Sequence, residues 1–387
     1  MKFRYESFGG IVASENPPSL VFVDKDFARN LGRDTSPLWD KKDQALLSGP
    51  VEAHFALTNY CASNCPGCYM ASMPEQNLTE DPKKDLERAK SIARTLSKMG
   101  VFHVALGGGE SFYLPWLFEI SEYIKSLGMI PNLTTNGQLM DRETAEKCRV
   151  FGQVNVSMDA VGEKFNQTRP FASFKKADEA LSLLKKAGIR AGINCVVTRK
   201  SFDYLHEVLA YARKKGLVDV ELLRFKPKGR GMDVYEDMRL TKKQAREFFP
   251  RLKKLAKKTR VRIKLDCSFT PFICYHKPDK RVMDFFSIMG CEAGNWLIGV
   301  NPEGRAVPCS FLEKPEIEIN NLSGNWSKKE LISEFRSMGN SVKGICRECD
   351  YFIPCKGGCR QVAIFLTGKT DAPDPECPFV EKSGGGI

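Results

Sequence analysis

Between residues 51 and 225, apolar segments with the length of strands alternate with segments of helical periodicity, about 30 residues per repeat. The expected strands are 54–58, 101–106, 130–134, 154–158, 189–197 and 218–225. The expected helices between them are 81–99, 114–127, 141–150, 174–187 and 202–215, and one more follows at 241–258. Such alternation predicts an α/β protein with a parallel sheet and right-handed crossovers. Because six units are too few to close an eight-stranded barrel, we expect an open, partial (β/α)6 barrel of TIM type.

The chain divides by composition into five parts. A lead-in, 1–50, contains an apolar run that predicts a short strand or hairpin followed by a helical turn. The barrel is expected over 51–240, and a connecting helix and linker over 241–285. Cysteine then becomes dense over 286–380, and the glycine-rich end, 381–387, is expected to be flexible.

Charge and hydropathy exclude some classes of partner. The chain of 387 residues has a net charge of +12, but its lysines occur as scattered pairs within helical segments and are not interleaved with aromatic residues. This pattern favours a solvated surface over a nucleic-acid interface. No signal-like start and no apolar run of about 18 residues occurs, so we expect a soluble, cytoplasmic protein with no membrane partner. In a reducing compartment, fourteen cysteines predict metal ligands rather than disulfides.

Three of these cysteines directly follow the first expected barrel strand. Cys61, Cys65 and Cys68 have the spacing Cys-x3-Cys-x2-Cys. Thiolates are the usual ligands of iron–sulfur clusters, and three of them leave one iron of a four-iron cluster without a protein ligand. A zinc site is the alternative interpretation of the triplet alone.

Further polar segments follow the later strands in the same order. They are Gly108-Gly109-Glu110, Thr135-Asn136-Gly137, and Ser157 with Asp159 in the segment VSMDA. Each is weak evidence alone, because glycine-rich turns and strand-end caps are common. Since the carboxyl ends of parallel strands gather at one edge, all are expected beside the cysteine triplet.

Together these segments resemble the radical S-adenosylmethionine (radical SAM) enzymes. In that family the open iron binds the amino and carboxylate groups of SAM, and reduction yields a 5′-deoxyadenosyl radical. The resemblance implies that the SAM-binding residues are Gly108, Gly109, Glu110, Asn136, Ser157, Asp159 and Arg169. This chain departs from the family pattern at Gly67, where an aromatic residue is usual, and at Ser111, where proline is usual. Tyr69 is therefore a candidate for the adenine contact, and no catalytic side chain is assigned.

A second group of seven cysteines resembles the SPASM domain, a C-terminal extension of many radical SAM enzymes. The resemblance implies two auxiliary [4Fe–4S] clusters, and hence three clusters in all. The outer cluster would be held by Cys346, Cys349, Cys355 and Cys377, and the inner one by Cys291, Cys309 and Cys359. The inner set is one ligand short, so either the site is open to substrate or another group completes it. Cys267 and Cys274 are candidates, although buried structural thiols are favoured there. A pair of structural zinc sites is the alternative for this region.

The remaining cysteines and histidines show no ligand spacing. Cys148 and Cys195 are expected in the core. His54 and His103 lie on expected inner strands and could face the barrel interior, but neither is assigned a role.

The resemblance specifies the initiating chemistry and leaves the substrate open. The lead-in, KFRYESFGGIV, is similar to that of maturases that modify the cofactor of tungsten-containing aldehyde ferredoxin oxidoreductases, which makes such a maturase the first hypothesis. A peptide- or protein-modifying maturase, of the sulfatase-maturase kind or acting on ribosomal peptides, is the alternative. A non-catalytic electron-transfer protein with several clusters is a hypothesis of another class. The enzyme would need a peptide, protein or cofactor precursor and a reductant such as ferredoxin or flavodoxin.

Overall fold

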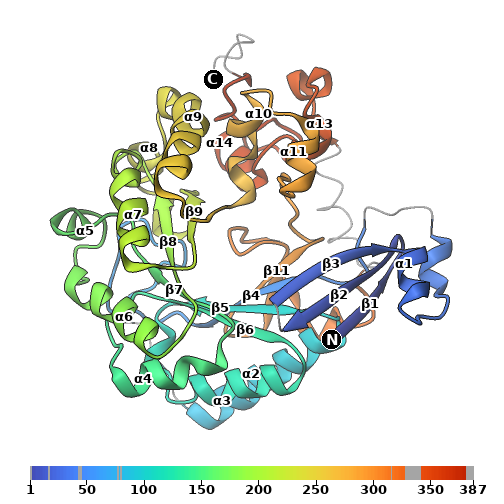
Figure 1. The fold of residues 1–387 in the computed structure, drawn as a ribbon, viewed down its shortest axis with the longest axis horizontal. Helices are drawn as coiled ribbons and strands as arrows, with labels where there is room; N and C mark the ends of the chain where they lie inside the picture. Colours follow the sequence, from blue (N-terminus) through green and yellow to red (C-terminus); the bar gives the residue numbers. More distant parts are fainter. Residues whose placement is uncertain are drawn as a thin grey trace.

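The computed structural model describes residues 2–15, 18–41, 46–75, 78, 81–314, 316–326 and 341–380. The tail expected at 381–387 lies outside these ranges. Figure 1 shows an arc of strands with helices on its outer side, a small sheet near the N-terminus, and a C-terminal region of short helices above one end of the arc.

Six parallel strands form the centre of the large sheet. They are β4 (Glu52–Thr58), β5 (His103–Gly108), β6 (Ile130–Thr135), β7 (Val154–Ser157), β8 (Ala191–Val197) and β9 (Val220–Arg224). Each pairs in parallel with its neighbour in chain order, which confirms the predicted sheet. The alternation along β4 explains its packing: Ala53, Phe55 and Leu57 are buried, whereas Glu52 and His54 are half-buried. This period of two places one set of side chains against the helices and the other toward the barrel interior.

The sheet continues beyond the six predicted strands. β10 (Ile263–Leu265) pairs in parallel with β9, and β11 (Leu297–Val300) pairs in parallel with β4. Antiparallel strands β12 (Arg305–Val307) and β13 (Ile317–Glu318) extend the β11 edge. Among the described strands β10 and β11 do not pair with each other, so the barrel is open. These added strands have two to four residues, too few to show a period in the sequence.

Helices cover the outer face of the sheet. The main ones are α2 (Pro82–Lys98), α3 (Leu117–Ser126), α4 (Arg142–Lys147), α6 (Phe174–Lys186), α7 (Ser201–Lys215) and α9 (Lys242–Thr259). Helix α2 begins where Asp81 accepts hydrogen bonds from the N–H groups of Lys83 and Lys84. Its apolar stripe, including Ile92 and Leu96, is buried in the main core. A short helix that the sequence did not predict, α5 (Glu163–Thr168), follows β7.

The lead-in forms a sheet of its own. Strands β1 (Lys2–Glu6), β2 (Gly9–Glu15) and β3 (Pro18–Asp24) are antiparallel, and α1 (Lys25–Asn30) follows. The sequence predicted a strand or hairpin, and the third strand corrects this. Phe22 of β3 stacks on Trp296, 5.3 Å between ring centroids, just before β11.

The C-terminal region consists mostly of short helices. Its elements are α10 (Thr270–Cys274), α11 (Lys280–Phe285), α13 (Phe352–Cys355) and α14 (Arg360–Thr367). The domain boundary expected between residues 285 and 286 stays a prediction. β11 lies beyond it in the sequence but pairs with β4 of the barrel sheet. In the ranges that the structure covers, none of the helices has the length and apolarity to cross a lipid bilayer.

Candidate active site

The cysteine triplet lies on the loop that leaves β4. Cys61, Cys65 and Cys68 are free, half-buried thiols. The loop curls around them through two backbone hydrogen bonds, from Cys68 N–H to the Cys65 carbonyl (3.2 Å) and from Ala71 N–H to the Cys68 carbonyl (3.1 Å). Burial raises the pKa of Cys61 and of Cys65, so both thiols need a cation to ionise. A donor set of three closely spaced thiols fits an iron–sulfur cluster.

Two glycines at the end of β5 bring that strand against the start of the cysteine loop. Gly109 N–H donates to the Thr58 carbonyl at 2.6 Å, and Glu110 N–H donates to the Tyr60 carbonyl at 2.8 Å. A Cβ on Gly109 would lie 2.0 Å from the Tyr60 oxygen, so no side chain fits. Gly108 has a φ of +106°, which favours glycine as well. The glycines are therefore required by the close approach of two strand ends.

The Glu110 carboxylate is buried and bonded within the protein. One oxygen accepts from the Thr135 hydroxyl at 2.8 Å, and the other accepts from Asn136 N–H at 2.7 Å. Burial raises the pKa of Glu110 above its ordinary value, although these hydrogen bonds lower it in part. Glu110 thus fixes the turn after β6. In that turn the Asn136 side-chain amide donates to Ser63 Oγ at 2.9 Å and lies 3.9 Å from Cys61 Sγ.

Asp159 and Arg169 form an ion pair on the other side of the triplet. Arg169 Nε lies 3.0 Å from Asp159 Oδ2, and Arg169 Nη1 lies 3.9 Å from Cys65 Sγ. The second Asp159 oxygen accepts from Val196 N–H at 2.7 Å. Burial alone would lower the pKa of Arg169, but Asp159 and Cys65 raise it above its usual value. The guanidinium is a fixed positive charge beside the thiols. Ser157, the last residue of β7, precedes Asp159 by two residues and is half-buried.

The two departures from the family pattern have a packing explanation in one case. A Cβ on Gly67 would come 2.7 Å from the Phe225 ring and 3.1 Å from Met238, so glycine is the residue that fits. Tyr69 packs its ring against Phe311, 5.2 Å between centroids, and burial raises its pKa to about 12. Ser111 is buried and donates to the Gly107 carbonyl at 3.3 Å.

Arg230 is a site residue that the sequence analysis missed. Its guanidinium donates twice to the Cys65 carbonyl, at 2.9 and 3.1 Å, and once to the Ser72 carbonyl at 2.9 Å. Its own N–H donates to the Cys68 carbonyl at 3.1 Å. The neighbouring Gly229 allows this approach, since a Cβ there would lie 2.6 Å from the Tyr69 oxygen. The glycine-rich segment after β9 was the available signal, but nothing in it names a partner.

The interior of the barrel is polar where β4 contributes Glu52 and His54 and β9 contributes Glu221. His54 Nε2 lies 3.3 Å from Glu52 Oε1, and His54 Nδ1 lies 3.1 Å from Ser310 Oγ. Burial lowers the pKa of His54, but the carboxylates of Glu52 and Glu221 raise it above its ordinary value overall. Burial, and then repulsion from Glu52, raise the pKa of Glu221 to about 6. His103 also faces this region; burial lowers its pKa.

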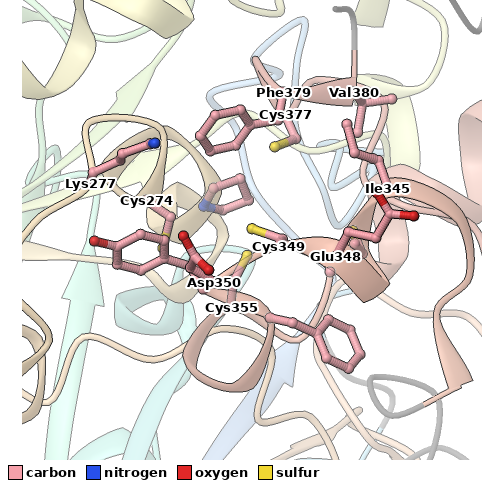
Figure 2. A pocket seen from close by; sticks show the side chains of 15 residues that line it. Cys274, Lys277, Ile345, Glu348, Cys349, Asp350, Cys355, Cys377, Phe379 and Val380 are labelled. Atoms are coloured by element: carbon pink, nitrogen blue, oxygen red, sulfur yellow. The ribbon is translucent and has the colours of Figure 1, made fainter. Parts of the chain in front are cut away.

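Four cysteines of the C-terminal region surround one cavity of about 260 Å³. They are Cys346, Cys349, Cys355 and Cys377, the set that the sequence assigned to an outer cluster. Figure 2 shows the sulfur atoms of Cys349, Cys355 and Cys377 at this cavity. Cys274 also lines it and packs against Cys355. A thiol-lined cavity of this kind fits a cluster.

The inner set lies closer to the barrel. Cys291 and Cys309 pack with Leu312 and Ile364, and Cys359 packs with Phe225. Burial, and then the charges of Cys291 and Cys359, raise the pKa of Cys309 to about 12. The expected core cysteines, Cys148 and Cys195, are fully buried in the main core.

Single-ion metal sites were the alternative for both cysteine groups. A zinc ion needs all its ligands about 2.0–2.3 Å from one atom. Within the ranges that the structure describes, no three His, Cys, Asp or Glu side chains converge in that way. A four-iron cluster instead accepts each thiolate on a different iron, and therefore from ligands that lie farther apart.

Comparison with known proteins defines the class. Residues 55–220 match the family model of the Radical SAM superfamily. These residues therefore form a radical SAM domain, which confirms the predicted radical SAM enzyme and implies a [4Fe–4S] cluster and SAM as its cofactors. The matched segment runs from within β4 to the first residue of β9.

Particular relatives extend over most of the chain. Mycofactocin maturase MftC of Mycolicibacterium smegmatis is 29% identical over 86% of this chain and 83% of its own length. AdoMet-dependent heme synthase of Methanosarcina barkeri (26%; 87% and 98%) and PqqA peptide cyclase of Gluconobacter oxydans (26%; 86% and 91%) are also similar. The crystal structure of SuiB from Streptococcus suis bound to S-adenosylmethionine has the same fold, with a TM-score of 0.75, 17% identity, and 97% and 98% coverage. None of these four names refers to tungsten, so the first hypothesis for the substrate gains no support from them.

Proposed function

We propose that this protein is a peptide maturase that uses radical SAM chemistry. The observation that carries the proposal is the convergence of four strand ends on the cysteine triplet: Gly109 after β5, Asn136 after β6, Asp159 after β7 and Arg230 after β9. When bound, the cluster and SAM together supply a 5′-deoxyadenosyl radical, which removes a hydrogen atom from the substrate. An electron carrier would have no need for this arrangement around an open ligand position.

The chain's own residues divide the work of holding the cofactors. Cys61, Cys65 and Cys68 would hold the cluster, and Arg169 would place positive charge where the SAM carboxylate binds. Asp159 keeps that guanidinium in position. Carbonyl groups of Gly108 and Gly109 would accept from the SAM ammonium. Glu110, whose oxygens are already bonded, would act on SAM binding by fixing the Asn136 turn.

Ser157 and Tyr69 would complete the SAM site. Ser157 ends β7 beside the polar interior, which suits a ribose hydroxyl. Tyr69 offers an aromatic face between the triplet and Phe311. The C-terminal cysteines would hold two auxiliary clusters, for which the thiol-lined cavity is the main support.

A peptide is the substrate class that the relatives favour. PqqA peptide cyclase acts on a peptide by its name, and SuiB has been crystallised with its precursor peptide SuiA. The barrel interior, with Glu52, His54 and Glu221, offers hydrogen-bonding groups that suit an extended polar chain. A haem precursor is the second candidate, because the match to the heme synthase spans 98% of the length of that protein. The tungsten-cofactor role has only the similarity of the lead-in. The reductant would be a ferredoxin or flavodoxin in the reducing cytoplasm.

Deuterium transfer tests the peptide proposal. The anaerobically reconstituted enzyme is given dithionite, SAM and perdeuterated synthetic peptides encoded beside its gene, and 5′-deoxyadenosine is analysed by mass spectrometry. Deuterium in the product supports the proposal. The proposal would be contradicted if the peptides gave 5′-deoxyadenosine without deuterium while a deuterated porphyrin precursor gave deuterated 5′-deoxyadenosine.

The triplet assignment has its own test. A variant with Cys61, Cys65 and Cys68 changed to alanine should lose about four irons and all 5′-deoxyadenosine formation. Cys148→Ala is the matched control, because it removes a buried thiol that lies in the main core. Cleavage that survives in the triple variant would contradict the assignment.

A further inference from the structure

The inner auxiliary set has three cysteines by sequence motif and needs a fourth group or an open iron. The candidates beyond the motif are Cys267 and Cys274, which lie outside the Cys-rich segment proper. Cys267 begins the short 3-10 helix Cys267–Phe269, directly after β10. Its two neighbours, Asp266 and Ser268, tie it to the inner set from two sides.

Asp266 connects Cys267 to the loop of Cys309. The ammonium of Lys226 forms an ion pair with the Asp266 carboxylate. The same ammonium lies 4.2 Å from the centroid of the Phe311 ring, two residues beyond Cys309. Lys226 is 6% exposed, so this bridge is inside the protein.

Ser268 connects Cys267 to Cys359. The Ser268 carbonyl accepts from Arg224 Nη1 at 2.8 Å. Arg224 pairs with Asp374 at 2.7 Å, and Asp374 in turn accepts from Cys359 N–H at 3.0 Å. A series of buried hydrogen bonds therefore connects the residue next to Cys267 with the backbone of Cys359.

Electrostatic neighbours agree with this placement. Cys267 lies within electrostatic range of Cys291, Asp266 and Cys359. The ammonium of Lys226 acts on Cys267, on Cys309 and on Cys359 alike, so all three thiols have one cation in common. A buried cation beside thiols stabilises an anionic cluster.

Cys274 belongs elsewhere. It packs against Cys355 and lines the outer cavity, which already has four cysteines. The structure therefore separates two thiols that the sequence could not distinguish.

We propose that Cys267 is the fourth ligand of the inner auxiliary cluster, completing the set of Cys291, Cys309 and Cys359. The inference rests on the proposed auxiliary clusters. It leaves no iron of the inner cluster free, so a substrate cannot bind there through iron.

The experiment uses the full chain without the triplet cluster (Cys61, Cys65 and Cys68 changed to alanine), so that only auxiliary iron is counted. Relative to this parent, with about eight irons, adding Cys267→Ala should remove iron by as much as adding Cys291→Ala. Alternatively a three-iron signal should appear in the electron paramagnetic resonance (EPR) spectrum of the oxidised protein. Adding Cys148→Ala, a matched buried thiol, should leave iron and spectrum unchanged. Iron and spectrum for Cys267→Ala equal to those for Cys148→Ala would overturn the proposal.

A second measurement needs no change in the C-terminal region. Cyanide added to the reduced triplet-free protein should leave its EPR spectrum unaltered, because every auxiliary iron has a thiolate. A cyanide-dependent spectrum would reveal an open iron and overturn the proposal. Neither readout involves SAM cleavage or a peptide, so both remain informative if the proposed peptide-maturase function is wrong. If the triplet-free parent protein binds no iron, the proposed auxiliary clusters are absent and the assignment of Cys267 is overturned with them.

Discussion

Arg224 and Asp374 form a buried, two-point ion pair that joins the last central barrel strand to the C-terminal region. Arg224 Nη1 lies 2.7 Å from Asp374 Oδ2, and Nη2 lies 3.0 Å from Oδ1. Glu376 adds a third carboxylate oxygen at 2.7 Å from Nη2. Because Asp374 also accepts from Cys359 N–H, the pair positions a proposed cluster ligand.

Asp374→Ala should destabilise the protein by about 3–5 kcal/mol, because it removes one partner of a buried charge pair and leaves Arg224 short of its acceptor. Anaerobic denaturant titration of the reconstituted protein measures the change. Glu146→Ala, which breaks an exposed pair with Arg149, serves as the control and should cost about 0.5 kcal/mol or less. Equal losses for the two variants would refute a structural role for the buried pair.

Arg230→Lys should speed the loss of iron from the triplet. Lysine is a point charge and cannot donate to the carbonyls of Cys65 and Ser72 together. Changes around metal ligands typically cost about 10-fold to 100-fold in metal affinity. The rate of iron transfer to a chelator measures this effect in the full chain. Arg213→Lys, on the exposed side of α7, should lose iron at the wild-type rate. If Arg230→Lys also loses iron at that rate, the hydrogen bonds of Arg230 to the cysteine loop are dispensable for holding the cluster.

Glu110→Ala should weaken SAM binding about 10-fold to 100-fold, since the buried N–H of Asn136 loses its acceptor at a cost of about 1–3 kcal/mol. Glu110→Gln should largely restore binding, because its oxygen can accept from Asn136 and its amide can donate to Thr135 Oγ. Calorimetric titration with SAM distinguishes two roles for this residue. If the carboxylate contacts the SAM ammonium directly, glutamine will be as damaging as alanine.

Glu221→Gln should stabilise the protein at pH 8 and have little effect near pH 4.5. The pKa of Glu221 is raised to about 6, so the folded protein holds this proton more tightly than the unfolded chain does. Its ionisation therefore costs stability above pH 6, on the order of 1–2 kcal/mol, and this cost disappears as the pH falls through the ordinary glutamate pKa. Denaturant titrations at several pH values test this, with the exposed Glu247→Gln as control. A benefit that is independent of pH would show that Glu221 is not the titrating group.

The sequence predicted the parts of the site that depend on strand order. Gly109, Asn136 and Asp159 each follow a strand with clear periodicity, and parallel pairing then brings them together. It could not predict Arg230, because a guanidinium that binds backbone carbonyls has no partner residue type to recognise. The position of Cys267 was equally hidden, because its connection to the inner set runs through Arg224, the last residue of β9, and Lys226, which follows that strand. β10 and β11 were too short for a periodic signal, so the full width of the sheet emerged only in three dimensions.

The pairing of β11 with β4 has a consequence for any attempt to divide the chain. β11 follows Cys291, and the loop of Cys61 follows β4, so a single hydrogen-bonded ladder sets the spacing between the two cysteine regions. A barrel cut at residue 285 would leave the backbone groups of β4 unpaired along one side, as an exposed apolar edge prone to self-association. The catalytic barrel is thus not a portable module, and its C-terminal extension serves also as the cover of its first strand.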